Sequence, residues 1–249
     1  MNNKIAKKQR ADILLFKQEL CASREEAKKL ILAGSVRIGK DYLIRKASDM
    51  LPGDTIFNIA APLQYVSRGA FKLLPALDAH LPSLEGLIAL DVGASTGGFT
   101  DLMLQRGATK VYTVDSGRGQ LHSKLRNDPR VTCHEKENAR YIDENFLPEK
   151  VDVITMDVSF ISVTKILPAA NTLLKPGGMA FILVKPQFEA GKSDVGKGGV
   201  VRDDSVRMKC VEKVRAFGEK DLNWKFKEIF SSPIKGPKGN QEYILVFES

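Results

Sequence analysis

The sequence predicts an α/β fold with a mostly parallel, seven-stranded sheet, preceded by a small α+β unit. Apolar runs typical of buried strands alternate with helix-like stretches from residue 65 onward, and this alternation indicates a parallel sheet covered on both faces. Basic residues gather instead in residues 1–60, which hold 12 Lys and Arg against 7 Asp and Glu. We therefore expect a first domain over 1–60, a linker over 61–64 and a second domain over 65–249.

The bulk composition excludes several classes of protein. Hydrophobic residues make up 43% and charged residues 27% of the 249 residues, which is ordinary for a globular protein. The sequence contains no run of about 18 apolar residues and no signal peptide, so we expect no membrane span and a cytoplasmic location. The three cysteines, Cys21, Cys133 and Cys210, are few and far apart. This argues against a disulfide framework and against a zinc cluster, and no metal is required.

The first 60 residues predict two short helices and two short strands. Apolar residues recur at roughly helical spacing over residues 10–33. Ser23 followed by Glu26 forms a capping box, in which each side chain accepts a hydrogen bond from a backbone N–H group of the first turn. Gly34 then ends the second helix. A strand and turn are expected at residues 35–39, and another short strand at residues 55–59.

The motifs of this segment resemble those of the S4 RNA-binding domain. They are Arg10 with Asp12, Ser23-Arg24 followed by Ala27, Leu30-Ile31, Gly34 with Val36 and Ile38, and Gly53-Asp54. The resemblance implies a basic face that contacts structured RNA through its phosphates, which provides affinity with little sequence readout. The implied RNA-binding residues are Arg10, Arg24, Lys28, Arg37 and Arg45. The basic surplus alone fits a solvated surface equally well.

The second domain contains the strand-like runs of the predicted sheet. Five apolar runs are expected to form its parallel part, at residues 88–91, 110–114, 130–133, 151–156 and 179–184. Two further runs flank a Pro- and Gly-rich connection and predict a closing antiparallel pair, at residues 224–230 and 242–247.

A glycine-rich turn follows the first of these runs. It reads Asp91-Val92-Gly93-Ala94-Ser95-Thr96-Gly97-Gly98-Phe99-Thr100. Open α/β sheets bind ligands at the carboxyl ends of their strands, where this turn lies. Glycines let the backbone approach a ligand closely. The Gly-x-x-x-Gly-Gly spacing differs from that of dinucleotide binders. The second run ends in Asp115, whose carboxylate can accept hydrogen bonds from both hydroxyls of a ribose.

Turn and acid together resemble the pattern of the Rossmann-like class I methyltransferases, which bind S-adenosylmethionine. The resemblance implies that this cofactor contacts the turn, the acid and the segments beside them. Residues 137–140 follow the third run, where the adenine would lie. The implied cofactor-binding residues are Ser67, Gly93, Ser95, Gly97, Gly98, Phe99, Asp115, Asn138 and Asp157.

Motifs that are absent from the sequence narrow the choice of the atom that accepts the methyl group. Enzymes that methylate amino groups carry an Asp/Asn-Pro-Pro-aromatic run after the fourth strand, where this sequence reads Asp157-Val158-Ser159-Phe160. Enzymes that methylate base carbons use a cysteine that often follows proline, and no Pro-Cys occurs. Oxygen is therefore the favoured acceptor. A ribose hydroxyl must lose its proton to attack, and a lysine whose pKa is lowered by burial can take that proton.

Four charged residues are expected at the cofactor edge of the sheet: Lys72, Asp157, Lys185 and Glu242. This set resembles the Lys-Asp-Lys-Glu tetrad of the FtsJ-like ribose 2′-O-methyltransferases. With the S4-like segment, the resemblance extends to the TlyA family, described both as haemolysins and as rRNA methyltransferases. It implies that Lys185 is the base, that Asp157 and Glu242 orient it, and that Lys72 places the ribose. The segments that carry it include residues 65–73, 93–100, 126–131, 157–162, 184–189, 198–202 and 239–243.

The function implied by this resemblance is 2′-O-methylation of a cytidine ribose in ribosomal RNA, with S-adenosylmethionine as methyl donor and an rRNA or ribosomal subunit as partner. The chain stops soon after the last expected strand, and short members of the family are associated with 23S RNA only, so we expect 23S rather than 16S RNA. Two alternatives stay open: a haemolysin that acts on membranes, and an S4 protein that binds RNA without catalysis.

Overall fold

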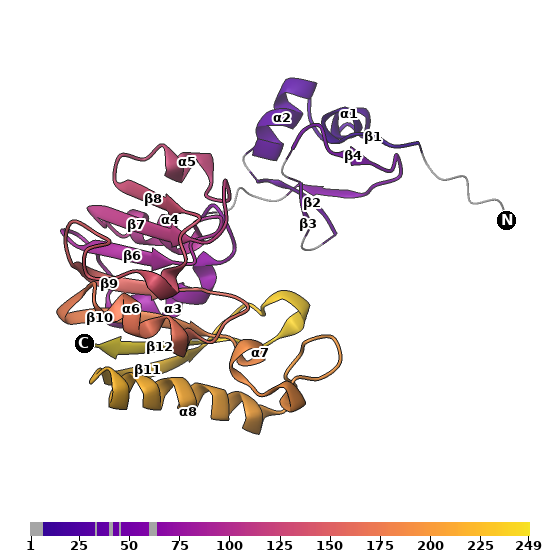
Figure 1. The fold of residues 1–249 in the computed structure, drawn as a ribbon. Helices are drawn as coiled ribbons and strands as arrows, with labels where there is room; N and C mark the ends of the chain where they lie inside the picture. Colours follow the sequence, from indigo (N-terminus) through magenta and orange to yellow (C-terminus); the bar gives the residue numbers. More distant parts are fainter. Residues whose placement is uncertain (1–6, 33, 40–41, 45, 60–63) are drawn as a thin grey trace. The chain divides into compact units, whose positions relative to one another are not determined.

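The structure is a computed structural model that describes residues 7–32, 34–39, 42–44, 46–59 and 64–249. The chain divides into two compact units, Met1–Gln64 and Tyr65–Ser249 (Figure 1). Of the expected linker over 61–64, residues 61–63 lie outside the described ranges. Within those ranges, no helix combines the length and the apolar character that crossing a membrane requires.

The first unit packs two helices against short strands. The helices are α1, Ala11–Lys17, and α2, Arg24–Leu32. An antiparallel sheet in the order β3-β2-β5 is formed by β2, Val36–Ile38, β3, Tyr42–Leu43, and β5, Phe57–Ile59. A separate antiparallel pair joins β1, Gln9–Arg10, to β4, Met50–Leu51. The buried core of this unit is Ala11, Leu14, Leu15, Ala27, Ile31, Val36, Ile44 and Phe57.

The ends of α2 follow the sequence prediction with one difference. Ser23 Oγ accepts the N–H of Glu26 at 3.1 Å, as the capping box requires. The Glu26 carboxylate accepts the N–H of Ala22 at 2.7 Å, outside the helix, and this part of the prediction was wrong because the side chain reaches one residue further back. At the other end Gly34 has a φ of 71°, a left-handed conformation that closes the helix.

The second unit is built on a seven-stranded sheet in the order β11-β12-β10-β9-β6-β7-β8. The strands β6 to β10 run parallel to one another, and β12 is antiparallel to both β10 and β11. The prediction of a mostly parallel sheet with a closing antiparallel pair is therefore confirmed. The strands are β6, Ile88–Val92; β7, Lys110–Asp115; β8, Val131–Glu135; β9, Val151–Met156; β10, Leu174–Val184; β11, Lys225–Ser231; and β12, Tyr243–Glu248.

Helices cover both faces of this sheet, and each face has its own core. Side chains alternate along the strands, so that Ala89 faces one core and Leu90 the other. One core contains α3, Ala70–His80, α4, Gly98–Gln105, and α5, Ser123–Arg126. The opposite core contains α6, Leu167–Asn171, and α8, Asp204–Asp221, which contacts β10, β11 and β12 (Figure 1). Short helices complete the unit: α7, Pro186–Glu189, and the 3₁₀ turns η1, Ala139–Tyr141, η2, Val163–Lys165, η3, Lys192–Asp194, and η4, Pro237–Gly239.

The topology brings several loops to one edge of the sheet. The parallel strands β6, β7, β9 and β10 all end at this edge, and the antiparallel strand β12 begins there. Open α/β sheets bind ligands outside the carboxyl ends of their strands. A functional site is therefore expected at this edge.

Candidate active site

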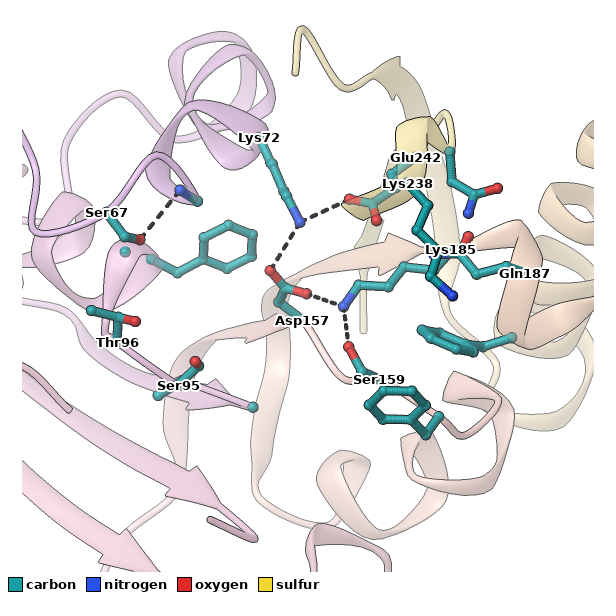
Figure 2. Close-up of a pocket in the computed structure, with 18 of the residues that line it drawn as sticks. Ser67, Lys72, Ser95, Thr96, Asp157, Ser159, Lys185, Gln187, Lys238 and Glu242 are labelled. Carbon is teal, nitrogen blue, oxygen red and sulfur yellow. Dashed lines mark hydrogen bonds and ion pairs between the residues drawn. The ribbon is translucent and has the colours of Figure 1, made fainter. Parts of the chain in front are cut away.

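Four charged side chains converge at this edge, and we call them the tetrad: Lys72, Asp157, Lys185 and Glu242 (Figure 2). Lys72 Nζ lies 2.8 Å from Glu242 Oε2 and 3.5 Å from Asp157 Oδ2. Lys185 Nζ lies 2.6 Å from Asp157 Oδ1 and donates a hydrogen bond of 2.7 Å to Ser159 Oγ. Asp157 therefore stands between the two lysines. Glu242 pairs with Lys72, whereas the family resemblance implied that it orients Lys185.

Each member of the tetrad comes from a different element. Lys72 lies in the first turn of α3, which packs on the sheet. Asp157 directly follows β9, and its N–H donates a hydrogen bond of 2.9 Å to the carbonyl oxygen of Val92 at the end of β6. Lys185 follows β10, and Glu242 precedes the neighbouring antiparallel strand β12. Because these strand ends share one edge, residues far apart in the sequence meet.

The tetrad is largely buried and has balanced charge. The side-chain exposure is 0% for Glu242, 8% for Lys185, 11% for Lys72 and 21% for Asp157. Burial on its own lowers the pKa of Lys72, but the carboxylates of Asp157 and Glu242 outweigh it, so the pKa is raised above its usual value. Lys72 is therefore an ammonium at neutral pH, which can donate a hydrogen bond but cannot accept a proton.

Contacts within the protein shape the glycine-rich turn. Gly93 has a φ of 82°, and a Cβ atom there would lie 2.6 Å from the carbonyl oxygen of Asp157. A Cβ atom on Gly98 would lie 2.4 Å from Ser67 Oγ. The two glycines therefore let the turn pack directly against the segments that carry Asp157 and Ser67. Both glycines also line the larger of the cavities at this edge, so their predicted contact with the cofactor stays a prediction.

Gly97 packs tightly against two leucine side chains. Its φ is 97°, and a Cβ atom there would lie 2.2 Å from Leu125 Cδ1 and 2.8 Å from Leu121 Cδ1. It does not line either of the two cavities at this edge, although we predicted that it contacts the cofactor. The absence of a side chain at Gly97 lets α4 start close to the segment that contains α5.

Asp115 is the last residue of β7, and backbone N–H groups occupy part of the hydrogen-bonding capacity of its carboxylate. Its Oδ2 accepts the N–H of Ser95 at 2.7 Å, and its Oδ1 accepts the N–H of Gly117 at 2.7 Å. A carboxylate offers about four acceptor positions, so about two remain for a ligand. The expected adenine residue Asn138 lies nearby on the same cavity, where its Oδ1 accepts the N–H of Arg140 and starts η1.

Two cavities adjoin at this edge. The larger, of about 440 Å³, is lined by the tetrad together with Ser67, Gly98 and Phe99. The smaller, of about 350 Å³, is lined by Asp115 and Asn138. Both are lined by Gly93, Ser95, Asp157, Ser159 and Phe160. An elongated ligand can therefore occupy both cavities, with its middle next to Asp157.

A buried carboxyl group, Asp91, supports the turn from below. It is 0% exposed, and it accepts hydrogen bonds from Thr100 N at 3.0 Å, Thr100 Oγ1 at 2.6 Å and Thr155 Oγ1 at 2.9 Å. These bonds hold the first turn of α4 to β6 and β9. Burial raises the pKa of Asp91 to about 6, because desolvation outweighs the donors that favour the charged form. We did not assign a role to this residue from the sequence, where it was only the acid before a glycine turn.

Phe160 is a second residue that sequence reasoning missed. Its side chain is 91% exposed, its φ is 66°, and its ring centroid lies 5.1 Å from that of Phe188. A bulky residue rarely adopts a positive φ. The aromatic position of the run that follows β9 was the available signal, because this run occupies the place of an acceptor-binding motif in other methyltransferases.

The predicted RNA-binding residues of the first unit have mixed environments. Arg10 Nε and Arg24 Nη2 bind Asp12, at 2.9 and 3.0 Å, and Asp12 is 0% exposed. The hydrogen bond from Arg10 is the largest influence that lowers the pKa of this carboxyl group to about 2. Both arginines therefore have a structural task that we did not foresee, although their side chains are 41% and 50% exposed and retain free N–H donors.

The remaining predicted RNA-binding residues are Lys28, Arg37 and Arg45. Lys28 Nζ forms a 2.5 Å ion pair with Glu25 on the same helix. Arg37 lies half-buried on β2, the central strand of the small sheet. Arg45 lies outside the described residues.

The chain is similar to known methyltransferases. The family model described as FtsJ-like methyltransferase matches residues 65–249. The 16S/23S rRNA (cytidine-2′-O)-methyltransferase TlyA of Mycobacterium tuberculosis is 41% identical over 97% of this chain and 90% of its own length. The 23S rRNA (cytidine-2′-O)-methyltransferase TlyA of Campylobacter jejuni is 36% identical over 84% of this chain and 83% of its own. A solved structure from Streptococcus thermophilus, whose name contains the word hemolysin, is 42% identical, with a TM-score of 0.75 over 98% of this chain and 89% of its own.

Proposed function

We propose that this chain, which belongs to the FtsJ-like methyltransferase family and within it to the TlyA proteins, methylates the 2′-oxygen of a cytidine ribose in ribosomal RNA. The chain is a methyltransferase with S-adenosylmethionine as its cofactor. The observation that carries the choice of acceptor is the convergence of the tetrad on one cavity. A buried, charge-balanced set of two lysines and two carboxylates suits the removal of a proton from a weakly acidic hydroxyl.

The two lysines have different tasks in this proposal. Lys72 stays protonated because Asp157 and Glu242 raise its pKa, so it holds the ribose oxygen by donating a hydrogen bond. Lys185 is the base, which in its uncharged form accepts the proton that the 2′-hydroxyl loses as its oxygen takes the methyl group. Asp157 Oδ1 and Ser159 Oγ fix the Lys185 amine between them. Glu242 acts on the reaction through Lys72.

The residues at the two cavities fit the cofactor. Asp115 has acceptor positions left for two vicinal hydroxyl groups, and Asn138 lies on the same cavity for the base. The larger cavity offers Ser67, Gly93 and Ser95 to the amino-acid end. S-adenosylmethionine, when bound, supplies a methyl group on a positively charged sulfur atom. Asp157 borders both cavities, so its carboxylate lies where that charge and the acceptor meet.

Other features support RNA as the substrate. The exposed ring of Phe160 borders the tetrad cavity, and an aromatic face can stack on any base. The basic surplus of the first unit and its S4-like motifs support RNA binding, with Arg37 and the outer N–H groups of Arg10 and Arg24 as contacts. We place the acceptor in 23S RNA, because 23S RNA stands in the names of both the M. tuberculosis and the C. jejuni relatives. An rRNA substrate supports a cytoplasmic location for the reaction.

Transfer of radiolabelled methyl groups from S-adenosylmethionine to purified ribosomal subunits tests this function. We expect wild-type protein to label 23S RNA and Lys185→Ala to lose at least about 100-fold in rate, as is usual for removal of a positioned general base. Lys213→Ala, which removes an amine that binds Glu189 outside the tetrad, is the matched control and should retain activity. Equal labelling by wild type and Lys185→Ala would overturn the mechanism. RNA binding without any methyl transfer would favour a non-catalytic S4 protein.

A further inference from the structure

We propose that Lys238 binds the phosphodiester group on the 3′ side of the target ribose and so positions the RNA at the tetrad. This inference rests on the proposed function, because it takes RNA as the substrate. Lys238 lies in η4, which precedes Glu242 and β12 in the chain. Its side chain lines the larger cavity together with the tetrad. Figure 2 shows it on the same side of the cavity as Glu242 and Lys185. It belongs to none of the residues assigned above.

The charges of the cavity single out this lysine. The two lysines of the tetrad are matched by its two carboxylates. The remaining carboxyl group in the lining, Asp91, is buried and turned toward Thr100 and Thr155. Among the described residues, the ammonium of Lys238 has no ion pair and no hydrogen bond. The cavity therefore offers one exposed positive charge to an anionic group of a ligand.

The backbone presents Lys238 in an unusual conformation. Its φ is 66° and its ψ is 6°, in the left-handed region that glycine adopts far more easily than lysine. Two backbone hydrogen bonds define the turn, from Gly236 N to Asn240 O at 2.9 Å and from Gly239 N to Gly236 O at 3.0 Å.

The neighbouring loop leaves room for the ammonium. Asn240, which is 2% exposed, donates a hydrogen bond of 2.9 Å to Gly199 O and accepts one of 3.0 Å from Val201 N. These bonds join the loop around residue 200 to the turn that carries Lys238. A Cβ atom on Gly199 would lie 3.6 Å from Lys238 Nζ, so the absence of a side chain there keeps the space beside the ammonium open.

The chemistry of RNA supplies an anion at the right place. The 2′- and 3′-oxygens of a ribose stand on adjacent carbons, so a 2′-hydroxyl that reaches Lys185 brings the 3′ phosphodiester group into the same cavity. An ammonium binds phosphate as a compact point charge.

Lys238→Gln tests the inference, because it removes the charge and keeps a side chain of similar length. Lys235→Gln is the matched control, since Lys235 is exposed in the same connection and does not line the cavity. We expect Lys238→Gln to raise the KM for RNA by about 10-fold, the usual scale for a charged hydrogen bond, with kcat within about three-fold. The slope of log(kcat/KM) against log[salt] should become less steep by about 0.7 to 0.9. Lys238→Arg should restore both values, and Lys235→Gln should change neither.

A modified substrate identifies the phosphate itself. Once the methylated cytidine is mapped, an RNA with a neutral methylphosphonate at its 3′ linkage can be compared with unmodified RNA. The modification should raise the KM of the wild-type protein and leave the KM of Lys238→Gln unchanged. If Lys238→Gln had the KM for RNA and the salt dependence of the wild type, the inference would be overturned while the proposed function stands. So would a loss confined to S-adenosylmethionine affinity, measured by calorimetry, since Lys238 would then bind the carboxylate of the cofactor. If wild-type protein methylates no rRNA, the proposed function fails first and this inference fails with it.

Discussion

Replacement of the buried Asp91 by Asn should change how the stability of the second unit depends on pH. Asp91 has a pKa of about 6 in the folded protein, against an ordinary value of 3.8. Between these values the folded state holds a proton that the unfolded state has lost, so the free energy of unfolding falls as pH rises. The shift of about two pKa units corresponds to about 3 kcal/mol, of which about 2 kcal/mol is lost between pH 4 and pH 7.

Asn at this position should remove that pH dependence. Its carbonyl oxygen can accept from Thr100, and the hydroxyl of Thr155 can turn to accept from the amide group. The stability of Asp91→Asn relative to wild type should therefore increase by about 2 kcal/mol from pH 4 to pH 7, although its stability at any one pH also reflects the altered hydrogen bonds. The difference between the two proteins cancels the contributions of all other titrating groups.

Urea unfolding measures this difference through a single probe. Trp224 is the only tryptophan of the chain, lies in the second unit and is 3% exposed, so its fluorescence reports on that unit. With an m-value of about 2 kcal/mol per molar urea, the relative midpoint should move by about 1 M between the two pH values. Parallel pH curves for the two proteins would refute the reasoning, because Asp91 would then have an ordinary pKa.

Three further predictions concern the turn, the first unit and the RNA. Gly97→Ala should lower the free energy of unfolding by about 2 to 4 kcal/mol, because of its positive φ and the collision with Leu125; an unchanged urea midpoint would contradict this. Asp12→Asn should destabilise the first unit by about 2 kcal/mol at pH 7, a contribution that wild type loses as pH falls from about 4 to 2; amide hydrogen exchange in α1 measures it, and wild-type protection would count against the role of Asp12. Phe160→Ala should raise the KM for RNA by about 5- to 10-fold and leave the Kd for S-adenosylmethionine unchanged; a loss of cofactor affinity alone would show that the ring serves the cofactor.

The repeated apolar runs made the fold of the second unit predictable. Each strand of its sheet lies within a few residues of a predicted run, because strands covered on both faces are continuously apolar. The short strands β1, β3 and β4 were not predicted, since two residues carry no periodicity. Tertiary pairing, rather than local sequence, creates them.

The candidate site was likewise predictable from the sequence only in part. The members of the tetrad could be named from the family resemblance, whose motifs are recognisable in the sequence, but the pairing of their side chains could not be predicted. That Glu242 binds Lys72 depends on side-chain packing across α3 and β12, which no sequence spacing reports. Asp12 illustrates the converse, because Arg10 and Arg24 look like free cations until the buried carboxylate between them is seen.

The chemical position of the transferred methyl group tests the central claim most directly. Alkali cleaves RNA through the free 2′-hydroxyl, so a 2′-O-methyl group protects the linkage next to it. We predict that alkaline hydrolysis of 23S RNA labelled by this protein leaves the radiolabel in a dinucleotide that begins with cytidine, and that Lys185→Ala yields no such product. Label recovered in mononucleotides would place the methyl group on a base and contradict the role proposed for Lys72, Asp157, Lys185 and Glu242.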